Sequence, residues 1–158
     1  EGCNGGLMDD AFKYVEAEGG LCSESEYPYT AKDGTCKSTS CGTKYDPITS
    51  YTDVTHDSET ALQSAVADGP VSIAIEADQS AFQFYSGGVL DGRCGTRLDH
   101  GVLAVGYGTS GSQEYWKVKN SWGATWGDKG YIYICRDCGK NGQKGECGIN
   151  MYPYYVTN

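Results

Sequence analysis

The chain lacks the features expected of a membrane-spanning or nucleic-acid-binding protein. A transmembrane helix needs roughly 18 apolar residues; the longest apolar run, residues 71–75, has only the length of a strand. Basic residues are few, the net charge is −9, and the largest basic cluster is Lys117 with Lys119. This balance argues against nucleic acid and against an anionic membrane as partners. Neither an initiator Met nor a signal peptide opens the sequence, so we expect a fragment or a processed piece of a larger protein.

Histidine is also scarce, which limits metal chemistry. The chain has eight Cys but only two His, at positions 56 and 100. Cys135 and Cys138 have the CxxC spacing of a zinc site, and Cys147 could add a ligand, but no second CxxC exists. Disulfides formed in an oxidising compartment are favoured over zinc. We expect no metal and no cofactor.

The hydrophobic pattern predicts one helix, then an irregular stretch, then a β-rich half. Apolar residues lie on one helical face of 7–18, which Gly19 and Gly20 end, and Ser58 is placed to cap a helix over 59–67. Residues 21–53 have turn chemistry and three Cys, and 80–85 favour a helical turn. The predicted strands are 71–77, 100–108, 114–122 and 130–134. This order indicates an α+β fold.

His100 and Asn120 are the candidates for chemistry. If strands 100–108 and 114–122 pair through the intervening loop, these two residues face each other within about one register step. An Asn carbonyl oxygen that accepts from one imidazole nitrogen would fix the ring and leave the other nitrogen facing outward, as the base and orienter of a nucleophilic triad do. The alternatives are a half-buried structural His and an Asn that caps a turn.

Three neighbours of this pair could tune it. An indole from Trp122 or Trp126 lying over the His–Asn hydrogen bond would exclude water, although both could equally be core aromatics. Asp99 precedes His100, so on a strand it should point to the opposite face, where its charge could still raise the His pKa. No Cys or Ser in the chain has the sequence setting of an activated nucleophile beside His100.

Several motifs, in order and end to end, resemble the papain family of cysteine proteases. They are EGCNGG (1–6), YPY (27–29), GPVS (69–72), CGTRLDH (94–100), VGYG (105–108), KNSWGATWG (119–127) and ECGI (146–149). GLM at 6–8 is similar to the cathepsin L-like branch, and CGINM at 147–151 to plant-type members. The resemblance implies a two-lobe α+β fold. Residues 1–53 would be the rest of a helical lobe, residues 54–150 a β-barrel lobe, and residues 151–158 a return of the chain to the helical lobe.

The resemblance assigns roles to the site residues. In this family a nucleophilic Cys lies about 130–150 residues before the His and Asn, so its equivalent would precede residue 1, together with the Gln of the oxyanion hole. His100 would pair with that Cys and protonate the leaving amine, Asn120 would orient His100, and Trp122 would shield the pair.

The resemblance also implies a substrate site. Gly5 and Gly6 would hydrogen-bond an extended peptide, and Trp126 would lie on the leaving-group side. The residues implied for the main specificity pocket, for which ordinary core packing is the alternative, are Leu7, Met8, Ala74, Leu98, Gly101 and Tyr152. Since none of these six is acidic, we expect a preference for bulky apolar side chains over Arg.

Cysteine pairing follows from the same resemblance. Cys94 and Cys147 match a family bridge, and Cys22 and Cys41 match an extra bridge of malarial members. Cys3 and Cys36 match positions whose partners would lie upstream. Cys135 and Cys138 match no pattern, so a local bridge and free thiols both remain open.

The expected function is therefore that of the C-terminal part of a papain-like endopeptidase, inactive alone because the nucleophile is missing. The expected partners are a peptide or protein substrate, the missing N-terminal segment, and a propeptide or a cystatin-type inhibitor, in a lysosome, a vacuole or the extracellular space. The alternatives are a catalytically dead homologue that binds or stores, and a homologue with Ser as nucleophile.

Overall fold

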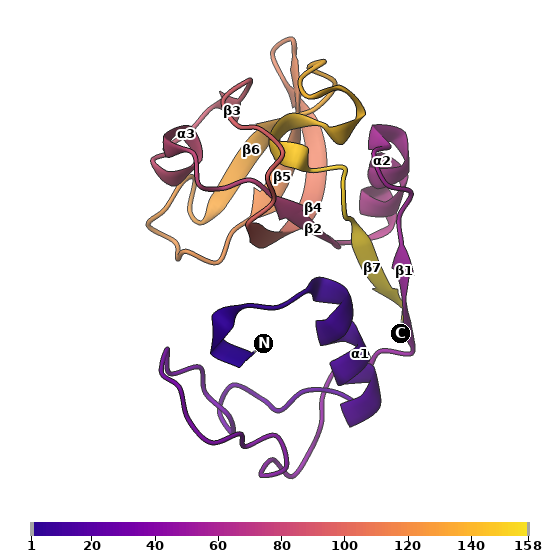
Figure 1. Cartoon of the computed structure of the whole chain (residues 1–158), viewed down its shortest axis with the longest axis vertical. Coiled ribbons are helices and arrows are strands. Elements are labelled where there is room, and N and C mark those ends of the chain that lie inside the picture. Colours follow the sequence, from indigo (N-terminus) through magenta and orange to yellow (C-terminus); the bar gives the residue numbers. More distant parts are fainter. Residues whose placement is uncertain (1, 158) are drawn as a thin grey trace. The chain divides into compact units, whose positions relative to one another are not determined.

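The computed structural model describes residues 2–157, so Glu1 and Asn158 lie outside the described residues. The chain divides into two compact units. The first contains residues 2–52 with 156–157, and the second contains residues 53–155. Each unit is described by itself below, and the α-helices and strands are labelled in Figure 1.

The first unit contains η1 (Gly2–Asn4), α1 (Met8–Glu18) and most of β1 (Ser50–Asp53). Helix α1 confirms the helix predicted over 7–18, with Leu7 as its N-cap. It ends at Gly19, whose φ of 72° is left-handed and lets its N–H reach back to the last turn. Of the predicted apolar face, Ala11 is exposed and the other members are only half-buried.

Residues 19–49 form no helix or strand apart from one bridge between Leu21 and Tyr45. The disulfide Cys22–Cys41, with Cα atoms 5.7 Å apart, closes this stretch. An irregular segment of this length has few backbone hydrogen bonds of its own, so the covalent bridge supplies much of its restraint. The predicted irregular, disulfide-tied segment is thus observed.

The second unit holds the remaining elements around one sheet. They are α2 (Glu59–Asp68), β2 (Val71–Ile75), α3 (Ser80–Gln83), β3 (Val89–Leu90), β4 (His100–Ser110), β5 (Gln113–Lys119), β6 (Tyr131–Cys135), η2 (Gly142–Lys144), η3 (Glu146–Gly148) and the first half of β7 (Tyr154–Thr157). The strand order is β7-β2-β4-β5-β6-β3. Among the described pairings of this unit, β3–β6 is parallel and the other four are antiparallel.

Side chains from α2, α3 and the central strands form the core of this unit. As predicted, the Ser58 hydroxyl caps α2 by accepting from the Ala61 N–H, and Leu62 and Val66 of this helix are buried. The apolar residues of the second unit with 0% exposure are Leu62, Val71, Ile73, Ile75, Phe82, Ala104, Trp116, Val118, Ile132, Ile134, Cys147 and Ile149. Alternate residues of β2, β5 and β6 therefore point into one apolar layer.

The strand ends differ from the predicted ones for local reasons. Strand β2 stops at Ile75 because the next two N–H groups bond outside the ladder: Glu76 to the Cys147 carbonyl and Ala77 to the Asp99 carboxylate. The β4–β5 hairpin is longer than predicted, with Ser110 paired to Gln113 across a turn in which Gly111 has φ +62°. Strand β5 ends at Lys119, so Asn120 lies just beyond it.

Two further disulfides tie the second unit. Cys94–Cys147, with Cα atoms 4.9 Å apart, joins the segment before β4 to η3. Cys135–Cys138, with Cα atoms 6.0 Å apart, closes the turn after β6 and resolves the pairing that the sequence left open. Among the described helices, none has the length and apolar character to cross a membrane.

Candidate active site

His100 and Asn120 meet in the second unit through a single hydrogen bond. The His100 Nε2 lies 2.8 Å from the Asn120 Oδ1. His100 begins β4 and is paired with Ile75 of β2, while Asn120 follows β5 and donates its backbone N–H to the Gly130 carbonyl. The β4–β5 register is what brings the two ends together, because Leu103 is paired with Lys119.

The hydrogen bonds around Asn120 also set the direction of this contact. The Ser121 N–H donates to the same Oδ1 at 2.8 Å, which identifies that atom as the carbonyl oxygen. The His100 Nε2 must then carry the proton, since an oxygen acceptor needs a donor. The second ring nitrogen, Nδ1, is left available for another group.

Aromatic rings enclose the pair on one side. Trp122 stacks on His100 with ring centroids 5.1 Å apart and an interplanar angle of 29°. Trp126 meets Trp122 edge-on at 5.3 Å, and its indole N–H donates to the Gln83 carbonyl. An indole over the imidazole keeps water away from the His–Asn hydrogen bond and strengthens it.

Phe82 of α3 completes this enclosure and was missed by the sequence reasoning. It is fully buried, and its ring lies edge-on to both His100 and Trp122, with centroids 6.4 and 5.4 Å apart. The sequence signal was weak, because Phe82 lies in a four-residue helix too short to show a hydrophobic period.

The other predicted site residues fall in both units. Ala74 and Gly101 are paired across β2 and β4, one step from His100, and Tyr152 packs on His56 with ring centroids 5.0 Å apart. Leu98 is half-buried before β4.

In the first unit, Gly5 and Gly6 are exposed between η1 and α1. Leu7 is the N-cap of α1 and is 65% exposed, and Met8 begins the helix. The Asp99 carboxylate accepts from the Ala77 N–H.

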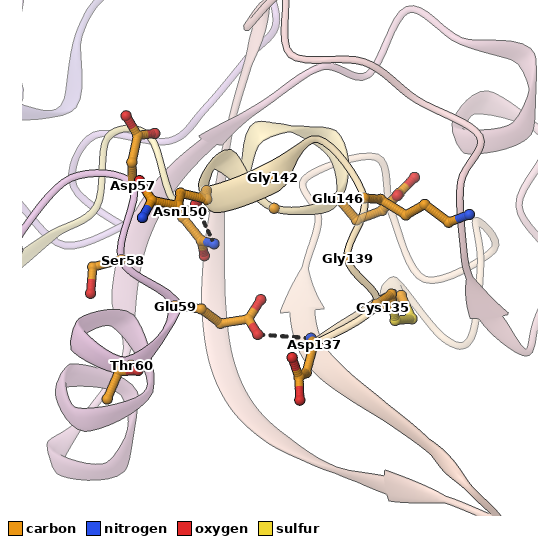
Figure 2. Close-up of a pocket in the computed structure, with 14 residues that line it drawn as sticks. Asp57, Ser58, Glu59, Thr60, Cys135, Asp137, Gly139, Gly142, Glu146 and Asn150 are labelled. Atoms are coloured by element: carbon orange, nitrogen blue, oxygen red, sulfur yellow. Dashed lines mark hydrogen bonds between the residues drawn. A yellow bond between two sulfur atoms is a disulfide. The ribbon is translucent and has the colours of Figure 1, made fainter.

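A separate pocket of about 320 Å³ also lies in the second unit. Figure 2 shows it between the start of α2 and the turns that follow β6. Its lining includes the carboxylates of Glu59 and Asp137 and the Cys135–Cys138 disulfide, but neither His100 nor Asn120. Burial raises the pKa of the Glu59 carboxyl, because desolvation disfavours the charged form. This pocket is distinct from the candidate active site.

The first unit carries two free, exposed thiols, Cys3 and Cys36. Hydrogen bonding from the Ser38 side chain, followed by its backbone, lowers the pKa of Cys36. The neighbouring Asp33 carboxylate raises the pKa of Cys3, since it accepts from the thiol and opposes the thiolate. The two thiols therefore differ in their thiolate fraction at neutral pH.

We predict that Cys36 reacts with iodoacetamide faster than Cys3 at pH 7, since only the thiolate attacks. Peptide mass spectrometry over a time course gives both rates. Ser38→Ala should slow Cys36 without changing Cys3, and Asp33→Asn should speed only Cys3. Equal rates in the unmodified chain would contradict the assignment.

Comparison with known proteins identifies the family to which this architecture and site belong. The sequence profile described as papain family cysteine protease matches residues 1–157. The chain belongs to the papain family of cysteine proteases, which confirms the resemblance seen in the sequence.

Two plant proteases are among the similar proteins. Cysteine proteinase RD21A of Arabidopsis thaliana is 50% identical over 98% of this chain and 33% of its own length. The senescence-specific cysteine protease SAG39 of Oryza sativa subsp. indica is 49% identical over 99% of this chain and 45% of its own length. The chain thus spans between a third and a half of these relatives.

Solved structures confirm the papain-like α+β fold. Bromelain protease from Ananas comosus, in complex with the E64 inhibitor, is 40% identical and superposes with a TM-score of 0.93, over 99% of this chain and 72% of that one. The proform of the ragweed pollen allergen Amb a 11, a cysteine protease, is 42% identical with a TM-score of 0.91, over 98% of this chain and 42% of that one.

Proposed function

We propose that this chain supplies the general base and its orienting residue to a cysteine endopeptidase of the Cys-His-Asn type. The observation that supports the proposal most directly is the His100–Asn120 hydrogen bond, with Trp122 stacked on the imidazole. This geometry holds the ring in the tautomer whose Nδ1 can take a proton from a thiol. The nucleophilic Cys itself would come from a segment that precedes residue 1.

The proposed reaction transfers an acyl group twice. The Cys thiol loses its proton to His100 Nδ1, and the thiolate attacks the scissile carbonyl carbon. The protonated His100 then gives that proton to the departing amine as the C–N bond breaks. Water, deprotonated by His100, attacks the thioester and releases the second product with the regenerated thiol. Asn120 keeps the ring oriented and stabilises its charged form in both halves.

We further propose that the residues assigned to substrate binding by the papain resemblance have those roles here. Gly5 and Gly6 would bond an extended peptide and Trp126 would contact the leaving-group side. The proposed specificity residues are Leu7, Met8, Ala74, Leu98, Gly101 and Tyr152. The substrate is a peptide or protein, and a propeptide or a cystatin-type inhibitor would occupy the same residues.

The compartment proposed is a lysosome or vacuole, or the extracellular space. Six of the eight Cys are in disulfides, which persist where the surroundings are oxidising. The two remaining thiols, Cys3 and Cys36, would pair with Cys residues of the preceding segment.

We predict that the isolated 158-residue chain has no measurable peptidase activity. No described Cys makes a hydrogen bond to His100, and a base without its nucleophile leaves only weak residual catalysis. The measurement is turnover of a dipeptidyl fluorogenic substrate, with RD21A assayed alongside. Turnover by the chain that an epoxide-type thiol probe abolishes would contradict the proposal. If the preceding segment has Ser at the nucleophile position, the chain belongs to a homologue with a Ser nucleophile. If it has an inert residue there, the chain belongs to a catalytically dead homologue that binds or stores.

For the complete enzyme we predict a preference for substrates with a bulky apolar or aromatic residue two positions before the scissile bond. The proposed pocket residues carry no acid, so an Arg guanidinium placed among them would lose its hydration without gaining a counter-charge. Profiling with substrates that differ only at this position measures kcat/KM for Leu, Phe and Arg. Arg equal to or better than Leu would show that the pocket is mapped wrongly, with Tyr152 the first position to re-examine.

A further inference from the structure

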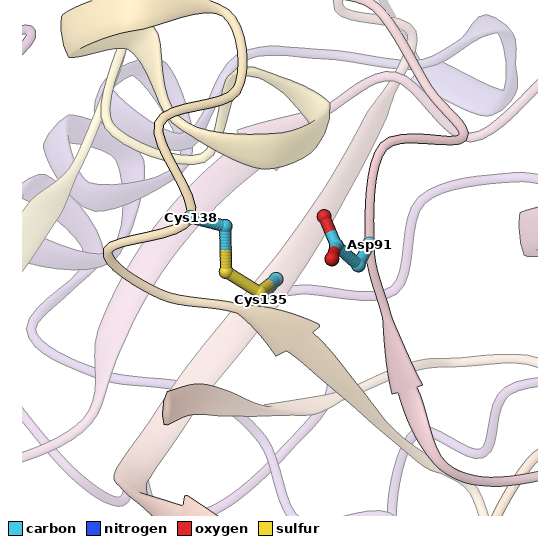
Figure 3. A group of neighbouring side chains, drawn as sticks. All are labelled: Asp91, Cys135 and Cys138. Carbon is cyan, nitrogen blue, oxygen red and sulfur yellow. A yellow bond between two sulfur atoms is a disulfide. The ribbon is translucent and has the colours of Figure 1, made fainter. Parts of the chain in front are cut away.

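A second group of reactive side chains lies in the second unit, apart from His100. The sulfurs of Cys135 and Cys138 and a carboxylate oxygen of Asp91 lie within 4.8 Å of one another. Figure 3 shows the Asp91 carboxylate directed toward the disulfide. The sheet explains the meeting: β3 pairs with β6 in parallel, Leu90 opposite Ile134, so the residues that follow these two lie side by side.

We propose that reduction of the Cys135–Cys138 disulfide converts this group into a binding site for Zn²⁺. The ligands are the two thiolates and the Asp91 carboxylate, with the fourth tetrahedral position open to water. Cys135 and Cys138 already have the CxxC spacing of zinc ligands, and their Cα atoms lie 6.0 Å apart. Two thiolates and one carboxylate also suit Zn²⁺ better than Mg²⁺ or Ca²⁺, which prefer oxygen ligands.

The chemistry needs a thiol reductant, which the site does not supply. A dithiol gives two electrons and two protons to the disulfide, producing two Cys thiols and its own cyclic disulfide. Zn²⁺ then replaces those two protons as it binds both sulfurs. In the oxidised chain the sulfurs are bonded to each other, so the site is closed to metal. Metal binding is therefore conditional on the redox state.

The surroundings give access to both the reductant and the metal. Cys135 and Cys138 line the pocket of about 320 Å³. Cys135 is almost fully buried, whereas Cys138 is half-buried and Asp91 is exposed, so access is through Cys138 and Asp91. Glu59 and Asp137 also line this pocket (Figure 2). Their charges would raise the local concentration of cations, and the positive charge of Lys140, which is also in the lining, opposes this effect.

Gln113 lies beside two of these three residues, Asp91 and Cys135. Its Nε2 donates to the Asp91 Oδ2 at 3.4 Å and lies 3.7 Å from the Cys135 sulfur. An amide donor aimed at a sulfur and a carboxylate stabilises negative charge on both, as groups around a metal site do. Arg136, between the two Cys, is instead turned to Glu114 and Gln63, so its charge is not directed at the sulfurs.

A second cluster of the same composition lacks these properties. Cys94, Cys147 and Glu146 also come within 4.8 Å. Cys147 and Glu146 are 0% and 2% exposed, and the Glu146 Oε1 already accepts from the N–H groups of Arg93 and Cys94. Only the Glu146 Oε1 has these backbone donors, so the clearer difference between the two clusters is that the Glu146 carboxylate is buried and the Asp91 carboxylate is exposed. Both clusters have residues in the lining of the pocket, so the exposure of Asp91 is what favours the first cluster as a metal site.

The test uses the whole chain with Cys3→Ser and Cys36→Ser, so that the two free thiols do not bind metal. The protein is reduced anaerobically with a dithiol, freed of reductant and titrated with Co²⁺, whose thiolate charge-transfer and tetrahedral absorption bands report coordination. We expect one equivalent of Co²⁺ to bind to the reduced chain, Zn²⁺ to displace it, and the oxidised chain to give no bands. Absence of the bands in the reduced chain overturns the proposal.

Two variants separate this site from other reduced cysteines. Cys135→Ser with Cys138→Ser should abolish the bands; bands that persist would place the metal elsewhere and overturn the proposal. Asp91→Asn retains the disulfide and should weaken Co²⁺ binding by about tenfold or more, whereas the matched control Asp68→Asn, an exposed acid at the end of α2, should not. Unchanged affinity in Asp91→Asn would overturn the three-ligand site. None of these readouts uses peptidase activity, so they are independent of the proposed function.

Discussion

His100→Ala should lower kcat/KM for peptide hydrolysis by about 10⁴-fold or more when the chain is part of an active enzyme. The variant removes the group that activates the thiol and the acid that protonates the leaving amine, so both halves of the reaction lose their proton carrier. A suitable enzyme is a chimaera in which the RD21A segment preceding the matched region is joined to residue 1, since the two proteins are 50% identical over the match.

Asn120→Ala in the same chimaera should cost less, roughly 10–100-fold. Without the Oδ1 acceptor the imidazole can still take a proton, but its orientation is no longer fixed at Nε2. His56→Ala is the matched control: it removes the only other His, leaves the His100–Asn120 pair intact and should keep kcat near that of the unmodified chimaera. A fully active His100→Ala chimaera, or equal losses for His56 and His100, would show that His100 is not the base.

The contact between His100 and Asn120 could be predicted because it follows from strand pairing alone. A hairpin brings the start of one strand to the end of the next, and the observed register joins Leu103 to Lys119 near this end. A β-bulge between Ala104 and Gly106 shifts the pairing toward the turn. It leaves the end of the hairpin near the His unaffected. The alternating pattern of the two strands and the position of one turn were therefore sufficient to predict that His100 and Asn120 lie close together.

The enclosure of His100 could not be predicted in the same way. Phe82 comes from a short helix 18 residues before His100 in the sequence, and its position depends on how α3 packs on the sheet. Such a contact has no sequence period, because it is fixed by tertiary packing rather than by the pattern of one element. The same holds for Asp91 and Cys135, which lie close together because β3 pairs in parallel with β6. Strand β3 has only two residues, and the sequence did not indicate it.

Removal of the Cys94–Cys147 disulfide by a double Ser substitution should destabilise the second unit by about 4 kcal/mol. The bridge joins residues 53 apart, and closing a long loop in the unfolded chain removes more entropy than closing a short one. All three Trp of the chain, at 116, 122 and 126, lie in this unit. Urea unfolding followed by Trp fluorescence therefore reports the change in its free energy of unfolding.

The matched control is the double Ser variant of Cys135 and Cys138, which lies in the same unit and is read by the same Trp residues. Its bridge spans a separation of only 3 residues, so the same entropy argument gives less than about 2 kcal/mol. In both pairs one Cys is almost fully buried, Cys147 at 0% and Cys135 at 1% exposed, so burial of a Ser hydroxyl costs a similar amount in each. Equal destabilisation by the two variants would show that this burial, and not loop closure, determines the loss. A clearly larger loss of unfolding free energy for the Cys94–Cys147 variant would show that this bridge stabilises the contact between η3 and the segment that precedes His100.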